Sequence, residues 1–96
     1  MISAKAQILE PKEFRKIDGI LTFDGEKLVF KSTDIYYPIT REVSANEIVQ
    51  TGARQNFWLF NRYFYIRTRE GRKFRFFTWK NKAFVREINK VIHKTE

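Results

Sequence analysis

The sequence predicts a mainly β domain with one C-terminal α-helix, an α+β fold formed by a single domain over residues 1–96. Three observations favour this class. An Asp-Gly pair separates two apolar runs, a second glycine lies between two alternating segments, and residues 80–94 carry apolar side chains at helical spacing. A chain of 96 residues with 43% hydrophobic content is long enough to bury one core.

The first clear hairpin turns at the Asp-Gly pair that follows Phe23. Such a pair between apolar runs is one of the strongest local signals for a two-stranded turn. If Phe23 faces Leu28 and Leu21 faces Phe30, both strands place their large residues on the same face. This pairing is the one that a sheet with a single buried face requires.

The flanking segments are less regular. Residues 4–9 are weakly β-like, and residues 35–37 could form a strand that the following proline ends. Residues 44–47 have the spacing of a capping box and are expected to form a short turn. Residues 48–51 then resume a strand, which Gly52 could bend.

The second hairpin spans residues 62–78, and its glycine determines the register. A two-residue turn would mix charged and apolar side chains on both faces. A three-residue loop that ends with Gly71 in the left-handed region separates them. The core pairs are then Ile66 with Phe74 and Phe64 with Phe76. The opposite face carries Tyr63, Tyr65, Arg67, Lys73, Arg75 and Phe77.

Residues 80–94 have the periodicity of an amphipathic helix. Either Thr78 or Asn81 can cap its start, because both side chains accept hydrogen bonds from backbone N–H groups. The apolar stripe consists of Phe84, Val85, Ile88, Val91 and Ile92.

A family resemblance is carried by residues 19–22 (GILT), 27–30 (KLVF), 47–48 (EI), 65–76 (YIRTREGRKFRF) and the last helix. In these positions the chain resembles the GRAM-type and small bacterial PH-like domains of the pleckstrin-homology superfold, over about residues 14–93. The resemblance implies a bent antiparallel sheet or partial barrel of about seven strands, capped by the helix. It also implies non-enzymatic binding of lipid headgroups or proteins.

The chain departs from the phosphoinositide-binding members of that superfold. Those domains place a basic cluster in and around the loop of the first hairpin. The corresponding loop is expected at residues 24–27 (DGEK), which are acidic on balance. Direct inheritance of phosphoinositide binding is therefore not expected.

Charge is distributed unevenly along the chain. Residues 1–50 contain seven Lys and Arg against eight Asp and Glu, whereas residues 51–96 contain twelve against three. The second half therefore supplies the whole formal excess of +8. A concentrated basic region attracts anionic partners such as a lipid surface, an acidic protein or a nucleic acid.

The outer face of the second hairpin is the first candidate site. Cations that neutralise phosphate alternate there with aromatic rings that suit a lipid interface or stacked bases. The alternative is a solvated strand face on which Arg stems cover the rings. The candidate ligand-binding residues are Tyr63, Tyr65, Arg67, Arg69, Arg72, Lys73 and Arg75.

The connection before this hairpin is the second candidate. Four large apolar residues lie between two arginines, so the segment could insert at a membrane interface. Alternatively, it begins the next strand and packs in the core, or it forms a dimer contact. The candidate membrane or partner contacts are Arg54, Phe57, Trp58, Leu59, Phe60 and Arg62.

Catalysis is not expected. The sequence has no cysteine and a single histidine, His93, which suits an exposed position at the helix end. No metal site, cofactor or catalytic residue is therefore predicted. With no signal peptide or long apolar run at the N-terminus, we expect a cytoplasmic protein, peripheral to the membrane if lipid is its partner. The expected function is an anionic-surface or acidic-protein binding module, with nucleic-acid binding or homodimerisation as alternatives.

Overall fold

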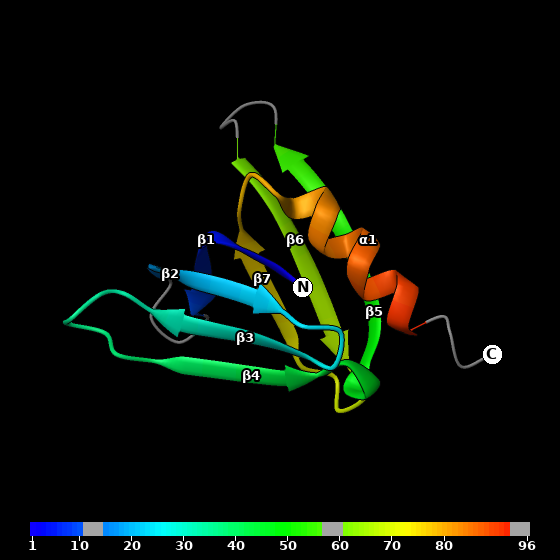
Figure 1. Cartoon of the computed structure of the whole chain (residues 1–96). Helices are drawn as coiled ribbons and strands as arrows, with labels where there is room; N and C mark the ends of the chain where they lie inside the picture. The colour runs from blue at the N-terminus through cyan, green and yellow to red at the C-terminus, as the bar shows by residue number, and fades with distance from the viewer. Residues whose placement is uncertain (11–14, 57–60, 93–96) are drawn as a thin grey trace.

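A computed structural model describes residues 1–10, 15–56 and 61–92 of the chain. It contains one seven-stranded antiparallel sheet, a short 3₁₀ helix and a C-terminal α-helix (Figure 1). The elements are β1 (Ile2–Glu10), β2 (Arg15–Phe23), β3 (Lys27–Ser32), β4 (Thr40–Ser44), η1 (Ala45–Glu47), β5 (Ile48–Asn56), β6 (Asn61–Thr68), β7 (Lys73–Phe77) and α1 (Asn81–Ile92). The predicted fold class, mainly β with one C-terminal helix, is confirmed.

The sheet is bent rather than closed, and its strand order is β4-β3-β2-β1-β7-β6-β5. Strand β1 pairs with β2 along its whole length, from Ile2 opposite Phe23 to Glu10 opposite Arg15. Its pairing with β7 is limited to Gln7 with Phe77 and Ile8 with Phe76. Strands β2–β4 and strands β5–β7 consequently run in clearly different directions on the two sides of this junction (Figure 1).

Both predicted hairpin registers are confirmed. Phe23 lies opposite Leu28, and Leu21 lies opposite Phe30. The core pairs of the other hairpin are Ile66 with Phe74 and Phe64 with Phe76. Gly71 has a φ of +87°, a backbone conformation that glycine adopts without steric strain.

The core lies between the sheet and α1, where four phenylalanine rings meet. The rings of Phe64 and Phe84 are stacked, with centroids 5.3 Å apart, and Phe76 lies 5.4 Å from Phe64 and 6.2 Å from Phe30. Helix α1 packs mainly on β5 and β6. Its predicted apolar stripe faces the sheet, with Phe84 and Ile88 fully buried.

Both predicted capping residues accept backbone hydrogen bonds near the start of α1, whereas the N-cap position, whose carbonyl oxygen accepts the Phe84 N–H, belongs to Lys80. The Thr78 hydroxyl accepts a hydrogen bond from the Lys80 N–H at 3.3 Å, and the Asn81 carboxamide oxygen accepts one from the Lys82 N–H at 2.9 Å. The Thr78 hydroxyl also donates to the carbonyl oxygen of Lys5 at 3.1 Å, which ties the helix start to β1.

The predicted strand at residues 35–37 is wrong, because these residues form a turn and the strand begins at Thr40. Asp34 is the cause. Its carboxylate accepts a hydrogen bond from the Tyr36 N–H at 2.9 Å, and its carbonyl oxygen accepts one from the Tyr37 N–H at 3.2 Å. These local bonds satisfy backbone groups that a strand would present to a neighbour.

The β-like segment at the N-terminus is a full strand, and this changes the numbering of the hairpins. Strands β1 and β2 form the first hairpin of the chain, and the turn at residues 24–27 connects β2 with β3. The expectation that treated these acidic residues as the loop of the first hairpin was therefore wrong. Residues 11–14, which connect the true first hairpin, lie outside the described residues.

The segment between β4 and β5 is the short 3₁₀ helix η1, which confirms the turn expected at residues 44–47. The side chain of Ser44 makes no capping hydrogen bond there, so the capping-box interpretation is wrong. The irregularity in β5 falls between Ile48 and Gln50 rather than at Gly52.

Candidate binding surface

The side chains of β5–β7 that point away from the core form a continuous surface. In the confirmed register Tyr63 pairs with Phe77, Tyr65 with Arg75, and Arg67 with Lys73. The pairing of β5 with β6 adds Arg54, which lies opposite Tyr63. We call this surface, completed by Lys16 of β2, the basic–aromatic face: Lys16, Arg54, Tyr63, Tyr65, Arg67, Lys73, Arg75 and Phe77.

Half-buried aromatic rings form the floor of this face. The rings of Tyr63 and Phe77 have centroids 5.2 Å apart and are tilted by 40°. Tyr65 lies further along β6 and is also half-buried. Because neighbouring strands hold these rings, their positions are set by the sheet.

Tyr65 is the centre of a polar cluster. The Arg54 guanidinium lies 5.3 Å from its ring centroid, and the Lys73 ammonium lies 4.8 Å from it. The Gln50 side chain donates a hydrogen bond to the Tyr65 hydroxyl at 3.2 Å. Gly52 lies opposite Tyr65, and a Cβ there would come within 2.9 Å of the ring. The glycine therefore lets the ring lie across β5.

Lys16 joins this face from the far side of the β1–β7 junction. Its ammonium lies 4.0 Å from the centroid of the Phe77 ring. Sequence reasoning missed both Lys16 and Gly52, since the contact of Lys16 depends on the pairing of β1 with the distant β7 and that of Gly52 on the register between β5 and β6. The two residues carry no local motif that would have marked them.

The cations of this face have no carboxylate neighbour among the described ion pairs. Those pairs lie elsewhere, between Lys27 and Glu42 at 3.4 Å and around Glu87 of α1. Arg67, Lys73 and Arg75 are all exposed. Positive charge on this face therefore remains available to an external anion.

The tip of the β6–β7 hairpin differs from the face. Arg72 lies 3.8 Å from Glu70, and both side chains are more than 70% exposed. The backbone N–H of Arg69 donates to the carbonyl oxygen of Glu47, which fixes the turn against η1. The two predicted tip residues, Arg69 and Arg72, thus flank the face, and Glu70 partly offsets the charge of Arg72.

The predicted apolar contact segment cannot be placed as a unit. Phe57, Trp58, Leu59 and Phe60 lie outside the described residues. The two flanking arginines have different neighbours, because Arg54 faces Tyr65 whereas the Arg62 guanidinium lies 4.9 Å from the Trp79 ring. Only Arg54 belongs to the basic–aromatic face.

An open hollow of about 510 Å³ lies beside this face, over β1 and β2. Trp79 forms one wall and is 74% exposed, and the Gln7 side chain on the floor donates a hydrogen bond to the Asp18 carboxylate at 2.7 Å. Its lining combines cations with apolar groups and includes Lys5, Ile20, Arg62 and Phe77. The sequence did not point to this hollow, because its walls come from five separate segments.

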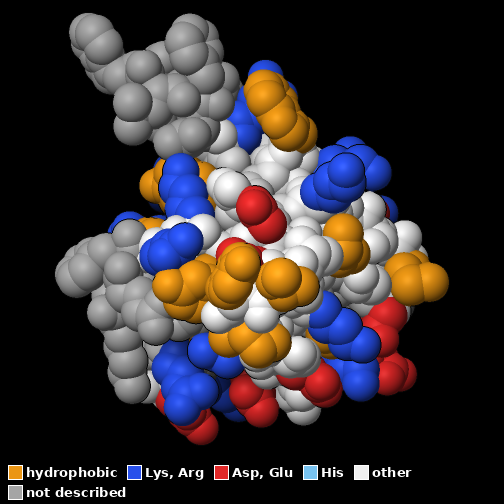
Figure 2. Space-filling model, turned by 90° about the vertical axis from the view of Figure 1, so that its left-hand side faces the viewer, with side chains coloured by type: hydrophobic (Ala, Val, Ile, Leu, Met, Phe, Trp, Pro, Cys, Tyr) orange, Lys and Arg blue, Asp and Glu red, His pale blue; other side chains and the backbone are white. Residues whose placement is uncertain are grey.

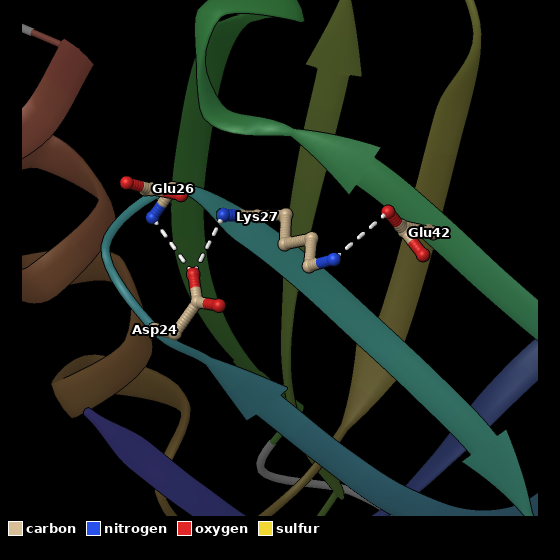
Figure 3. Close-up of polar contacts among 4 residues, drawn as sticks. All are labelled: Asp24, Glu26, Lys27 and Glu42. Atoms are coloured by element: carbon tan, nitrogen blue, oxygen red, sulfur yellow. Dashed lines mark hydrogen bonds and ion pairs between the residues drawn. The ribbon is translucent and has the colours of Figure 1, made fainter.

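Asp24 has a structural role in the β2–β3 turn (Figure 3). One carboxylate oxygen of Asp24 accepts hydrogen bonds from the backbone N–H groups of Glu26 at 2.8 Å and Lys27 at 2.9 Å. These two donors, that of Lys27 first, lower the pKa of the exposed Asp24 carboxyl below its ordinary value. The turn therefore explains Asp24 without a catalytic role.

Residues 1–10, 15–56 and 61–92 contain no group of three or more His, Cys, Asp or Glu side chains that could hold a metal ion. In the same part of the chain, no helix is long and apolar enough to cross a membrane.

Comparison with known proteins identifies the fold alone. No family model matches the sequence, and no curated protein is significantly similar to it. Among solved structures, the C-terminal domain of an unknown protein from Leishmania infantum superposes with a TM-score of 0.80 at 13% sequence identity. The match covers 97% of this chain and 83% of that domain. This seven-stranded sheet with its terminal helix therefore occurs in at least one other protein.

Proposed function

We propose that this chain is a non-catalytic binding module of the PH and GRAM type that recognises an anionic membrane surface through the basic–aromatic face. The observation that carries the proposal is the set of exposed cations on β5–β7 with no carboxylate neighbour among the described ion pairs. Juxtaposed basic residues near an anionic leaflet contribute about 1 kcal/mol each.

The cations lie over the aromatic rings, and this favours lipid phosphate over stacked bases. Arg54 and Lys73 both approach the Tyr65 ring, and Lys16 approaches the Phe77 ring. Proteins that bind single-stranded nucleic acid offer free ring faces on which bases stack. Here the rings support the cations instead, so the face is better suited to a layer of phosphates.

Charge reversal on the outer strand positions tests this proposal. The triple variant Arg67→Glu, Lys73→Glu and Arg75→Glu should lose several kcal/mol of membrane affinity, about a hundredfold or more, because attraction becomes repulsion. Affinity is measured by co-sedimentation with vesicles of phosphatidylserine and phosphatidylcholine at two salt concentrations. Binding by the wild type should weaken as salt shortens the Debye length, which is about 10 Å at 0.1 M.

A matched control separates this face from net charge. The variant Lys80→Glu, Lys82→Glu and Arg86→Glu removes the same charge from exposed positions of the α1 region. It should retain most of the vesicle binding. Equal losses in both triple variants would contradict the assignment of the site. Wild-type binding to oligonucleotides but not to vesicles would favour the nucleic-acid alternative, and binding to neither would favour an acidic protein partner.

A further inference from the structure

The β3–β4 loop, residues 33–39, carries an exposed apolar tip that the anionic-surface proposal does not use. Ile35 and Tyr36 are each 82% exposed. The loop extends well beyond the ends of the two strands that it connects (Figure 1). Two large apolar side chains are therefore presented to solvent at a protruding point of the molecule.

The loop holds this tip in a defined conformation. The Asp34 carboxylate accepts the Tyr36 N–H at 2.9 Å, and the Ser32 hydroxyl accepts the Asp34 N–H at 3.0 Å. At the base, the Ser32 N–H donates to the carbonyl oxygen of Ile39 at 2.9 Å. The exposure of the tip is thus a consequence of specific turn geometry, and little further ordering is needed when it meets a partner.

Two neighbouring residues of β2 lie between the loop and the basic–aromatic face. The Arg15 guanidinium donates a hydrogen bond to the Tyr37 hydroxyl at 2.8 Å and lies 4.4 Å from the ring centroid, which anchors the loop next to its tip. The next residue, Lys16, projects to the opposite side of the sheet and lies over the Phe77 ring of that face. Figure 2 views the molecule from the side toward which the loop extends and shows hydrophobic side chains grouped near the middle, with Lys and Arg side chains around them and Asp and Glu side chains among them and along the lower edge.

We infer that Ile35 and Tyr36 insert into the interfacial layer of an anionic membrane while the surrounding cations contact lipid phosphates. This inference rests on the proposed function and names the lipid-inserting element. Two side chains are far too little surface for a standard protein interface, which buries about 800 Å² on each partner. A tyrosine beside an aliphatic residue suits the boundary between headgroups and acyl chains.

Single-cysteine labelling tests the insertion directly, because the chain contains no cysteine of its own. A polarity-sensitive dye on Ile35→Cys should shift to shorter emission wavelength on phosphatidylserine–phosphatidylcholine vesicles, and lipids brominated near the headgroup end of the acyl chains should quench it. The control is the same dye on Lys82→Cys. Lys82 is exposed and lies in α1, away from both the loop and the basic–aromatic face (Figure 1). This label should show neither effect.

An affinity measurement completes the test. The double variant Ile35→Ser, Tyr36→Ser should bind the same vesicles about tenfold to a hundredfold more weakly, because apolar burial is lost, and its residual binding should still respond to salt. The control Lys82→Ser should retain most of the vesicle binding. A dye on residue 35 that stays in water on vesicle-bound protein would overturn the inference and leave the proposed function intact. No vesicle binding by the wild type at low salt would overturn both.

Discussion

Replacing Phe84 by alanine should remove the main contact between α1 and the sheet. The ring is fully buried, and it stacks on Phe64 with an interplanar angle of 12°. Phe64 belongs to the middle of β6, and the start of α1 is hydrogen-bonded to β5 and β6 through Asn81. Neither β6 nor the start of α1 can therefore shift freely to fill the cavity that the substitution leaves.

The size of the effect follows from this packing. Truncation of a buried Phe costs about 3–5 kcal/mol, and the cost is greatest where the surroundings cannot collapse. We therefore expect a value near the upper end of that range. For a domain of about this size, such a loss lowers the melting temperature by about 15–25 °C. It is also a large share of an ordinary stability of about 5–15 kcal/mol.

Urea denaturation followed by circular dichroism measures this loss. Lys82→Ala, an exposed change in the same helix, is the control and should stay within about 0.5 kcal/mol of the wild type. The slope of the free energy against urea should be unchanged if both states keep their compactness. A Phe84→Ala midpoint equal to that of the control would refute the docking of α1 through this ring.

Two further predictions concern the hairpins. Gly19→Ala should cost about 1–3 kcal/mol, because the added Cβ would clash with the carbonyl oxygen of Lys31 and the ring of Phe30, and a wild-type denaturation midpoint would contradict this. Asp24→Ala should destabilise the β2–β3 turn at pH 7 and have little effect in strong acid. Since the folded-state pKa of Asp24 is lowered, its contribution is fully present above the ordinary carboxyl pKa of 3.8 and is lost as the pH falls through the lowered value. If the difference in unfolding free energy between wild type and variant does not change with pH, the ionised Asp24 carboxylate does not stabilise the turn in this way.

Local patterns in the sequence predicted the parts of the fold that depend on local chemistry. Gly71 favours a hairpin loop whose register separates charged from apolar side chains, and that register places Phe64 and Phe76 in the core. The stripe around Phe84 predicts α1 because helical spacing needs only one segment to be read. Each of these signals lies within a few residues of the structure that it specifies.

The two misjudged segments are determined by backbone hydrogen bonds that the side-chain pattern does not reveal. Strand β1 has two alanines and several polar side chains among its apolar residues, and its pairing with β2 is what makes it a strand. At residues 35–37 the β-propensity of the side chains was decisive in the prediction, whereas the backbone bonds to Asp34 decide the structure. Propensity is weak evidence when a neighbouring Asp can bond to the backbone directly.

The same reasoning applies to the candidate surface. The alternation of Tyr63, Tyr65 and Arg67 along β6 predicted their common face, because strand geometry alone requires it. The position of Lys16 beside Phe77 depends on the pairing of β1 with the distant β7, and that of Gly52 beside Tyr65 on the register between β5 and β6. The described structure therefore adds residues on both sides of the predicted face and keeps Tyr63, Tyr65 and Arg67 at its centre.

Asn81 shows how the core and this surface depend on each other. It is 3% exposed, and its side-chain N–H groups donate to the carbonyl oxygens of Arg54 and Tyr63, each at 3.1 Å. Those two residues carry their side chains to the opposite side of the sheet, on the basic–aromatic face. One side chain at the helix start thus joins neighbouring positions on β5 and β6, at the point where the face presents a cation beside a ring. Because the buried amide fixes these backbones, the spacing of Arg54 and Tyr63 is set before any ligand arrives.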